Sequence, residues 1–368
     1  MEVHDSIQPS DSFSVEKAAW FRSSLLEWFN LNGRVLPWRG TQDPYKIWVS
    51  EVILQQTRVN QGWDYYTRFI DRYPTVKELA ESSTEELLLM WQGLGYYNRA
   101  HNMQFTARHI VEEHNGVFPQ DPRIVRGLKG IGDYTTAAIC SIAYNTPLAV
   151  IDGNVYRVLS RFYGIELPID TATGKKTFQT LADSTLDTKR PGAYNQAIMD
   201  LGAMVCTPKQ PNCNNCPVAA HCVASYSPLA EQLPIKAKKT AVQERFLDFL
   251  CFVTANAIMV GQRDKMGIWK NLYQFPVKES NHCNMTDAEI REWINLVSPS
   301  KVFRIEKKKE IQHLLTHRKL HICIHVVRVY QTFPLKGFSW IPLDTHTAYA
   351  FPRPIRAFLN DNFGTAVQ

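Results

Sequence analysis

The sequence has no long hydrophobic run, no internal repeat and no low-complexity tract. None of its apolar stretches reaches the roughly 20 residues of a membrane helix, so we expect no membrane association. The N-terminal stretch MEVHDSIQPSDSFS has neither the apolar core of a secretory signal nor an Arg-rich targeting pattern. The composition, 45% hydrophobic and 21% charged, excludes extensive disorder. The sequence therefore predicts a cytoplasmic globular protein.

Cysteines are few, eight in 368 residues, but half of them lie in one short segment. These four, with the spacing C-x6-C-x2-C-x5-C, are Cys206, Cys213, Cys216 and Cys222. Four thiolates in one loop can hold a tetrahedral zinc ion or a cubane iron–sulfur cluster. Because nothing in the sequence indicates secretion, we predict a metal site rather than a disulfide framework. The spacing alone leaves zinc and iron open.

The length and the periodicity indicate two domains. A chain of 368 residues is long for a single core, and its net charge of +6 is compatible with a polyanionic partner without requiring one. Helical periodicity runs to about residue 224, whereas the stretch that follows has two prolines, a lysine cluster and no periodicity. We predict a helical domain over 1–224, a linker over 225–243 and an α+β domain over 244–368.

Several elements have recognisable start signals. Asp43 and Pro44 predict an N-cap and the first residue of a helix, and Thr286 with Glu289 predicts a capping box. Further helices are expected near 60–72, 84–91, 98–114, 133–144, 153–163, 173–183 and 192–204. The segment LHICIHVVRVY predicts a strand with one buried face, because apolar and other residues alternate. The apolar set is Leu320, Ile322, Ile324 and Val326, and the opposite set is His321, Cys323 and His325.

The stretch LKGIGDYTTAAI, residues 128–139, places two glycines before a predicted helix. A dinucleotide fingerprint would need a preceding strand and a third glycine, but the preceding DPRIVRGLK looks helical. A helix, a tight Gly-x-Gly turn and a second helix form the pattern of a helix–hairpin–helix, which holds a DNA phosphate through backbone N–H groups. A plain helix–turn–helix corner has the same pattern.

Two carboxylates lie in apolar surroundings. Asp152, in AVIDGNVYRVLSR, precedes the helix predicted from residue 153, so an N-cap is its simplest role. The capping N–H groups would also keep this carboxylate ionised. Glu51 lies in the middle of a predicted helix between Ser50 and Val52, and an acid in such a helix usually faces water.

Taken in order, these motifs resemble the adenine DNA glycosylase family of the helix–hairpin–helix base-excision superfamily. The match runs through WVSEVILQQT, GLGYYNRA, LKGIGDYT, VIDGNV, NQAIMDLGA and the cysteine loop, roughly residues 36 to 224. The resemblance implies two helical lobes beside a DNA cleft and a 4Fe–4S cluster in the loop 206–222. It also implies a monomeric, nucleoid-associated protein whose partner is duplex DNA with A:8-oxoguanine or A:G mispairs.

The resemblance assigns roles to residues. Glu51, with a pKa raised by burial, would protonate adenine N7, and Asp152 would stabilise the oxocarbenium-like sugar or trap it covalently. Asn154 would orient Asp152, and Tyr134 would line the same pocket. Lyase members carry a lysine where this chain has Tyr134, so a monofunctional enzyme that leaves an abasic site is implied. The implied DNA-contacting residues are Arg39, Gln56, Thr57, Tyr96, Leu128, Gly130 and Gly132.

The segments MGIWKNLYQFPV and AYAFPRP resemble parts of the Nudix-like domain that this family uses to recognise 8-oxoguanine. No G-x5-E-x7-R-E-x2-E-E helix is present, so nucleotide hydrolysis by this domain is not expected. The Phe-Ser-His loop of many members corresponds to Leu315, Thr316 and His317, with Leu315 in place of the aromatic residue.

Two other functions remain open from the sequence. One is an endonuclease III-like pyrimidine glycosylase with lyase activity, and the other is a non-catalytic iron–sulfur protein that binds damaged DNA. The paired carboxylates argue against the second, because a binder does not require them.

Overall fold

The computed structural model describes residues 14–237, 242–263, 267–281, 284–298, 303–315 and 317–364. The chain divides into two compact units, Met1–Glu81 with Phe105–Lys239, and Ser82–Gln104 with Thr240–Gln368. The second unit thus includes a segment that the predicted domain boundaries assign to the helical domain. Within the described ranges, no helix combines the length and the apolarity that a membrane crossing requires.

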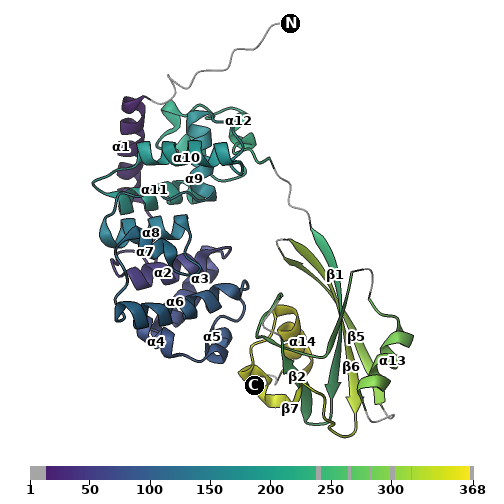
Figure 1. The fold of residues 1–368 in the computed structure, drawn as a ribbon. Coiled ribbons are helices and arrows are strands. Elements are labelled where there is room, and N and C mark those ends of the chain that lie inside the picture. Colours follow the sequence, from purple (N-terminus) through teal and green to yellow (C-terminus); the bar gives the residue numbers. More distant parts are fainter. Residues whose placement is uncertain are drawn as a thin grey trace. The chain divides into compact units, whose positions relative to one another are not determined.

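The first unit is built from helices (Figure 1). Those wholly within it are α1 (Val15–Asn32), α2 (Pro44–Leu54), α3 (Val59–Arg72), α4 (Val76–Glu81), α7 (Pro122–Gly127), α8 (Asp133–Tyr144), α9 (Gly153–Tyr163), α10 (Ala172–Thr185), α11 (Pro191–Met204) and α12 (Leu229–Gln232). Two single 3-10 turns, η1 (Cys213–Asn215) and η2 (Ala219–His221), lie in the cysteine loop. The helices predicted from periodicity are confirmed within two residues at each end.

Capping explains where the helices of the site begin. The Asp43 carboxylate accepts hydrogen bonds from the N–H groups of Tyr45 and Lys46, and Pro44 is the first residue of α2, as predicted. Asp152 caps α9 in the same way. The buried core that fixes α1, α8, α9, α10 and α11 includes Phe21, Leu25, Ala138, Phe162, Phe178, Tyr194 and Leu201. The site residues on α8, α9 and α11 are therefore held by one hydrophobic core.

The second unit contains a seven-stranded mixed sheet with the order β3-β2-β1-β6-β5, in which β4 pairs with β1 and β7 with β2. Only β1 and β6 pair in parallel among the described strands. The strands are β1 (Gln243–Val253), β2 (Ala257–Gln262), β3 (Tyr273–Gln274), β4 (Val277–Ser280), β5 (Phe303–Leu315), β6 (Arg318–Val329) and β7 (Ser339–Pro342). The unit also holds α5 (Thr84–Met90), α13 (Asp287–Val297), η3 (Leu343–Ala348) and α14 (Arg353–Phe363), and α6 (Asn98–His114) begins in it.

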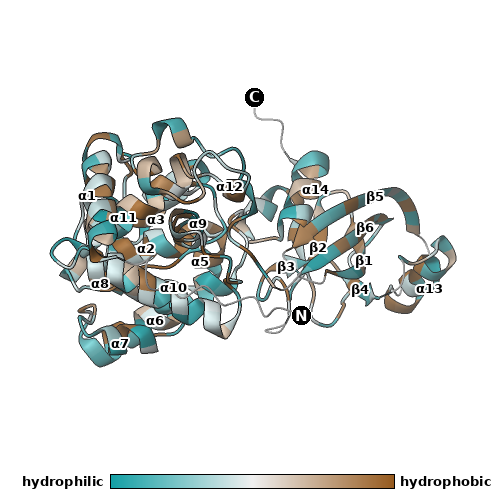
Figure 2. Ribbon diagram, turned by 90° about the horizontal axis from the view of Figure 1, so that it is seen from above, coloured by the Kyte–Doolittle hydropathy of each residue, from teal (hydrophilic) through white to brown (hydrophobic). Residues whose placement is uncertain are grey.

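Helices cover both faces of this sheet. One face packs against α14 through Ile355 and Phe358, and the other packs against α13 through Ile290, Trp293 and Ile294. The helix α13 carries hydrophobic and hydrophilic residues (Figure 2), and it begins with the predicted capping box of Thr286 and Glu289. The helical and α+β parts of the predicted fold class are confirmed.

The predicted strand is confirmed as β6, with its apolar set buried, but the prediction that its other face is open is wrong. Cys323 and His325, expected on an open face, are 0% and 1% exposed, and His321 is partly buried. The alternation of apolar and other side chains along β6 is present, but α13 and neighbouring segments cover the second face. Because α13 lies some thirty residues earlier in the chain, a local pattern in β6 could not indicate this cover.

Candidate active site

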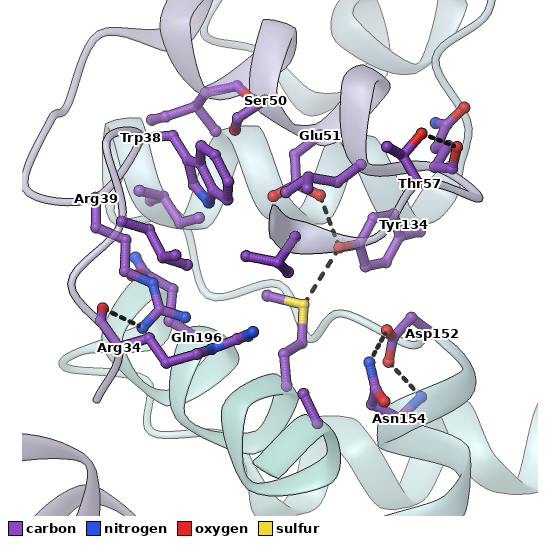
Figure 3. A pocket seen from close by; sticks show the side chains of 18 of the residues that line it. Arg34, Trp38, Arg39, Ser50, Glu51, Thr57, Tyr134, Asp152, Asn154 and Gln196 are labelled. Atoms are coloured by element: carbon purple, nitrogen blue, oxygen red, sulfur yellow. Dashed lines mark hydrogen bonds between the residues drawn. The ribbon is translucent and has the colours of Figure 1, made fainter. Parts of the chain in front are cut away.

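A cavity of about 430 Å³ in the first unit collects all four predicted catalytic residues (Figure 3). Glu51 comes from α2, Tyr134 from the first turn of α8, and Asp152 and Asn154 from the start of α9. Other lining residues include Arg34, Trp38, Arg39, Gln56, Thr57, Gln196 and Met199. The order of the four catalytic residues in the chain gives no hint that three helices, α2, α8 and α9, direct them into one cavity.

Glu51 is buried within this cavity, with 8% of its surface exposed. Burial raises the pKa of Glu51 to about 7, and the nearby Asp152 adds to this rise, while Tyr134 and Arg39 oppose it. All residues of α2 from Ile47 to Ile53 are buried, so this part of the helix offers Glu51 no exposed face. The predicted rise of the Glu51 pKa is confirmed, and the alternative of a water-facing acid is wrong.

Asp152 has the N-cap hydrogen bonds that the sequence predicts. Its Oδ1 accepts from the N–H groups of Asn154 and Val155, each over 2.8 Å, and its Oδ2 accepts from Asn154 Nδ2 over 2.8 Å. Burial raises the pKa of Asp152 above its usual value, although these hydrogen bonds and Arg157 act to lower it. These hydrogen bonds therefore reduce the rise of the Asp152 pKa but do not cancel the effect of burial on it.

Tyr134 connects the acid to the opposite wall. Its hydroxyl donates to Glu51 Oε2 over 2.7 Å and lies 3.2 Å from Met199 Sδ. Burial raises the pKa of Tyr134 well above its usual value, so the hydroxyl keeps its proton and donates a hydrogen bond to the carboxylate. The hydroxyl, rather than an amine, is the polar group of α8 in this pocket.

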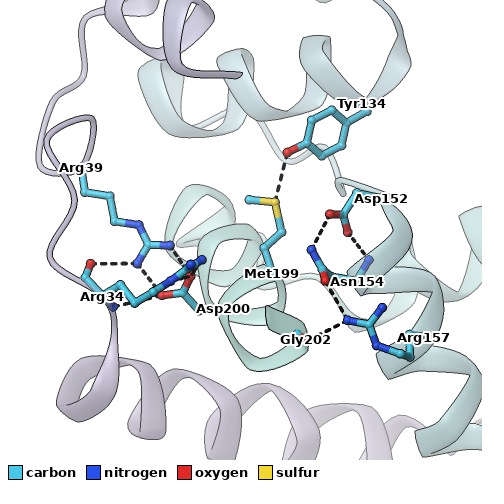
Figure 4. A network of polar contacts seen from close by, with 9 residues as sticks. All are labelled: Arg34, Arg39, Tyr134, Asp152, Asn154, Arg157, Met199, Asp200 and Gly202. Atoms are coloured by element: carbon cyan, nitrogen blue, oxygen red, sulfur yellow. Dashed lines mark hydrogen bonds and ion pairs between the residues drawn. The ribbon is translucent and has the colours of Figure 1, made fainter. Parts of the chain in front are cut away.

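Arg157 hydrogen-bonds to the Asn154 side-chain oxygen, while the Asn154 side-chain nitrogen binds Asp152 (Figure 4). Its Nη2 donates to Asn154 Oδ1 and to the Gly202 carbonyl, each over 2.7 Å, and its Nε donates to the Cys206 carbonyl over 2.7 Å. This arginine joins the start of α9 to the end of α11 and to the first loop cysteine. The sequence analysis did not single it out; its position three residues after Asn154, on the same helical face, was the available signal.

Arg39 lies in the pocket wall, bound to a carboxylate that the sequence analysis also missed. Asp200 of α11 is fully buried and accepts from Arg39 Nη2 over 2.7 Å and from Arg34 Nε over 2.9 Å (Figure 4). Burial acts to raise the pKa of Asp200, but hydrogen bonds from Arg39 and Arg34 hold it below its usual value. Since Asp200 is shared by two arginines, this wall retains a net positive charge.

The predicted hairpin joins α7 to α8. Gly130 has a φ of +84°, a left-handed conformation that glycine adopts most readily, and both Gly130 and Gly132 are exposed. Gly132 caps α8 without a side chain, so the first N–H groups of α8, which have no intrahelical acceptor, have no capping side chain either. Leu128 is only 4% exposed and anchors the turn in the core instead of facing outward.

Two predicted DNA contacts have unusual backbone conformations. Gln56, just after α2, has a φ of +60°, and Tyr96 has a φ of +48° with 49% of its surface exposed. Such strain in non-glycine residues is concentrated at functional sites. Thr57 follows Gln56 at the rim of the active-site cavity.

The predicted 8-oxoguanine loop lies at the turn between β5 and β6. Leu315 is the last residue of β5, and His317 is exposed just before β6. Within the second unit, Leu315 and His317 line one cavity together with Tyr96 and Trp269. Thr316 lies outside the described residues.

The four loop cysteines line one small cavity at the end of α11, and none of them forms a disulfide. Arg161 is 2% exposed and donates from Nη1 to Cys206 Sγ over 3.3 Å. Backbone N–H groups of Val218 and Ala224 hydrogen-bond to Cys216 and Cys222.

The fold and the site define the class of the protein. Residues 49–183 match the family described as HhH-GPD superfamily base excision DNA repair protein, and residues 249–361 match the NUDIX domain. The solved structure of a thermostable thymine-DNA glycosylase superposes with a TM-score of 0.53 at 26% identity, covering 57% of this chain and 97% of that one. The chain is thus a base-excision repair glycosylase with a second, Nudix-like part.

Similarity over the full length specifies the family. Adenine DNA glycosylase of Buchnera aphidicola subsp. Schizaphis graminum is 34% identical over 351 residues, which cover 92% of this chain and 97% of that protein. Adenine DNA glycosylase of Mus musculus is 32% identical over 370 residues, covering 86% of this chain and 72% of that protein. The chain belongs to the adenine DNA glycosylase family, and it is an enzyme that hydrolyses N-glycosyl bonds.

Proposed function

We propose that the protein removes adenine mispaired with 8-oxoguanine, and also adenine opposite guanine, and that it leaves the abasic strand uncut. The observation that carries the chemistry is the joint placement of Glu51 and Asp152 in one cavity beside Tyr134. Hydrolysis of an N-glycosidic bond needs a proton for the departing base and negative charge beside the cationic sugar. Two carboxylates in one pocket can divide these tasks.

Glu51 is the general acid in this proposal. Because burial raises its pKa to about 7, a large fraction of Glu51 carries a proton at neutral pH and can transfer it to adenine N7. The Tyr134 hydroxyl holds the carboxyl group in place over 2.7 Å and stabilises the carboxylate that remains after the transfer. An adenine in this cavity must first leave the helix, at a cost of a few kcal/mol that is smaller at a mispair.

Asp152 supplies the negative charge. Two backbone N–H groups and the Asn154 amide stabilise its ionised form and fix its orientation. An oxocarbenium-like sugar beside Asp152 would gain electrostatic stabilisation that the neutral substrate does not receive. Arg157 positions Asn154 and hence this carboxylate. The geometry supports both electrostatic stabilisation and covalent trapping by Asp152.

Duplex DNA is bound, in this proposal, through its backbone at the α7–α8 hairpin. The exposed glycines and the uncapped start of α8 offer N–H groups to a phosphate. Gln56, Thr57 and Tyr96 enter the duplex near the mispair, while Leu315, Thr316 and His317 contact the oxidised guanine. We further propose that the protein acts as a monomer, in the cytoplasm, at the nucleoid.

The four cysteines would hold a 4Fe–4S cluster. The four cysteines line one small cavity, so their thiolates can bind one shared metal centre, and the resemblance to this family favours the iron–sulfur cluster over zinc. N–H donors from Arg161, Val218 and Ala224 suit sulfur atoms that carry negative charge. The cluster would supply a crosslink of the loop 206–222, and iron and sulfide analysis of the purified protein tests its type.

The substrate is tested by single-turnover excision on three duplexes in parallel, with A:8-oxoguanine, A:G and thymine glycol. We expect fast adenine release from the first, slower release from the second and none from the third. Absence of adenine release from A:8-oxoguanine at any enzyme excess would refute the proposal, and release of thymine glycol would favour an endonuclease III-like activity.

Borohydride trapping tests the monofunctional assignment separately. A Schiff base needs an amine at the sugar, and Tyr134 cannot provide one. We expect little or no trapped complex with the wild type and some with Tyr134→Lys. Efficient trapping by the wild type would show that another amine attacks the sugar.

A further inference from the structure

Outside the active site, Asp248, Cys323 and His325 form a compact group in the second unit. Asp248 lies on β1 and is the register partner of Cys323 on the parallel strand β6. His325 follows Cys323 by two residues, so its side chain is on the same face of the sheet. Three potential ligands are therefore carried by two adjacent strands, which is a rigid foundation for a metal site.

The distances within this group suit coordination of one ion. The ligand atoms of the three side chains lie within 4.8 Å of one another, and His325 Nε2 is 3.0 Å from Asp248 Oδ1. Around a tetrahedral zinc ion, with bonds of about 2.0 Å to nitrogen or oxygen and 2.3 Å to sulfur, ligand atoms are about 3.3 to 3.8 Å apart. Small side-chain rotations would bring the group from its present spacing to this one.

The surroundings hold the carboxylate in position. Asp248 Oδ2 accepts from the Met285 N–H over 2.9 Å and from Asn284 Nδ2 over 3.2 Å. These two bonds, from the segment that leads into α13, orient the group and leave Oδ1 directed at His325. Such outer hydrogen bonds are typical of protein metal ligands.

The charges also balance. All three residues are at most 1% exposed, and a buried charge is costly unless it is paired. A divalent ion bound to one thiolate, one carboxylate and one neutral imidazole would give a site of zero net charge. The set of one sulfur, one nitrogen and one oxygen ligand is also one that zinc accepts, whereas calcium and magnesium prefer oxygen alone.

We propose that Asp248, Cys323 and His325 bind one Zn²⁺ ion, which links β1, β6 and the segment before α13. Glu310 of β5, the register partner of Cys323 on its other side, is exposed and paired with Lys308, so the buried group itself supplies three ligands. This site is separate in sequence from the loop 206–222 and does not depend on its cluster. Because the ligands are buried, the ion is acquired as the chain folds.

The test is metal analysis of the full-length protein produced in zinc-containing medium, with zinc and iron measured on the same sample. We expect Cys323→Ala to carry one zinc fewer per chain than the wild type, with unchanged iron. Cys251→Ala is the matched control, because Cys251 is equally buried on β1 but belongs to the core on the other face. Even if the cysteine loop held zinc, the difference between the variants would report the Asp248 site alone.

A second variant guards against misfolding of Cys323→Ala. Asp248→Asn preserves the shape and can still accept from Met285, yet it is a weaker ligand, so its zinc content should also fall. With Co²⁺ in place of Zn²⁺, Cys323→Ala should show less sulfur-to-cobalt absorption than the wild type, and Cys251→Ala should match the wild type. Equal zinc in the wild type and both folded site variants, or equal cobalt–sulfur absorption in the wild type and Cys323→Ala, would overturn the proposal and leave a metal-free hydrogen-bonded cluster.

Discussion

At the scale of single residues, the surroundings of Glu51 convert an ordinary carboxyl group into a candidate acid. Burial of α2 shields Glu51 from water, and the Tyr134 hydroxyl donates one hydrogen bond to it. Asp152 shares the cavity but has three hydrogen bonds to its oxygens. The two carboxylates differ in partners more than in burial, and this difference assigns the proton donor.

We predict that Glu51→Gln binds an A:8-oxoguanine duplex but excises adenine at least about a hundredfold more slowly, the scale of lost general acid catalysis. The wild-type single-turnover rate should fall as the pH rises through about 7, because the protonated acid is then lost. Glu27→Gln, on the exposed surface of α1, is the control and should match the wild type. A Glu51→Gln variant that stays fast would remove the acid role.

The same pKa has a consequence for stability. The folded protein holds a proton on Glu51 up to about pH 7, whereas the unfolded chain releases it near 4.5, so stability is lost as the pH rises between these values. A shift of this size corresponds to about 3 kcal/mol. In urea unfolding, Glu51→Gln should gain stability over the wild type on going from pH 5 to pH 8. A pH-independent difference would contradict the raised pKa.

At the scale of elements, the α7–α8 hairpin uses different residues to fix the turn in the core and to face solvent. Leu128 and Ile131 are buried and fix the turn, whereas Gly130 and Gly132 between and after them remain exposed. Only glycine combines the left-handed φ at residue 130 with a close approach of a phosphate to the backbone. The loop is thus suited to bind a phosphate through its own backbone N–H groups rather than through side chains.

We predict that Gly130→Ala weakens binding of duplex DNA and reduces the dependence of affinity on salt by about one phosphate contact. Gly116→Ala is the matched control, since Gly116 has a similar φ of +75° and open space around its α-carbon. Both changes should cost about 1 kcal/mol of stability through backbone strain. Equal DNA affinities of the two variants would show that the hairpin does not hold a phosphate.

Prediction from sequence succeeded for elements whose signals are local. The caps at Asp43, Asp152 and Thr286 and the helix at 133–144 depend on neighbours within a few residues. The open face assigned to β6 was wrong because the cover over Cys323 and His325 is remote in the chain. For the same reason the sequence did not reveal the Asp248 group, since Asp248 precedes Cys323 by 75 residues.

At the scale of the whole molecule, we propose that two parts of the chain contact the two bases of one mispair. The helical unit holds the carboxylates, and the β5–β6 turn in the second unit carries Leu315 and His317. Discrimination between 8-oxoguanine and guanine should therefore be separable from excision chemistry. The predicted boundaries, 1–224, 225–243 and 244–368, differ from the two compact units, since residues 82–104 belong to the second unit and the first extends to Lys239.

We predict that His317→Ala lowers the preference for A:8-oxoguanine over A:G about tenfold, the effect of one lost hydrogen bond, while the A:G rate stays unchanged. The ratio of single-turnover rates on the two duplexes measures this. Gln312→Ala, exposed on β5, should leave the ratio at its wild-type value. A fall in both rates together would assign His317 to folding or catalysis instead.

The sequence by itself determined the helices, their caps, the cysteine loop and the family, because each depends on local spacing or on motifs in a fixed order. It also supplied Glu51, Asp152 and Tyr134 as candidates, through resemblance. Only the tertiary structure showed that Glu51 is buried and that Arg39 forms an ion pair with Asp200. It also showed that Arg157 connects Asn154 to the cysteine loop. Burial and pairing between distant segments set the pKa values and the local charge, and a short stretch of sequence cannot predict either contact or burial of this kind.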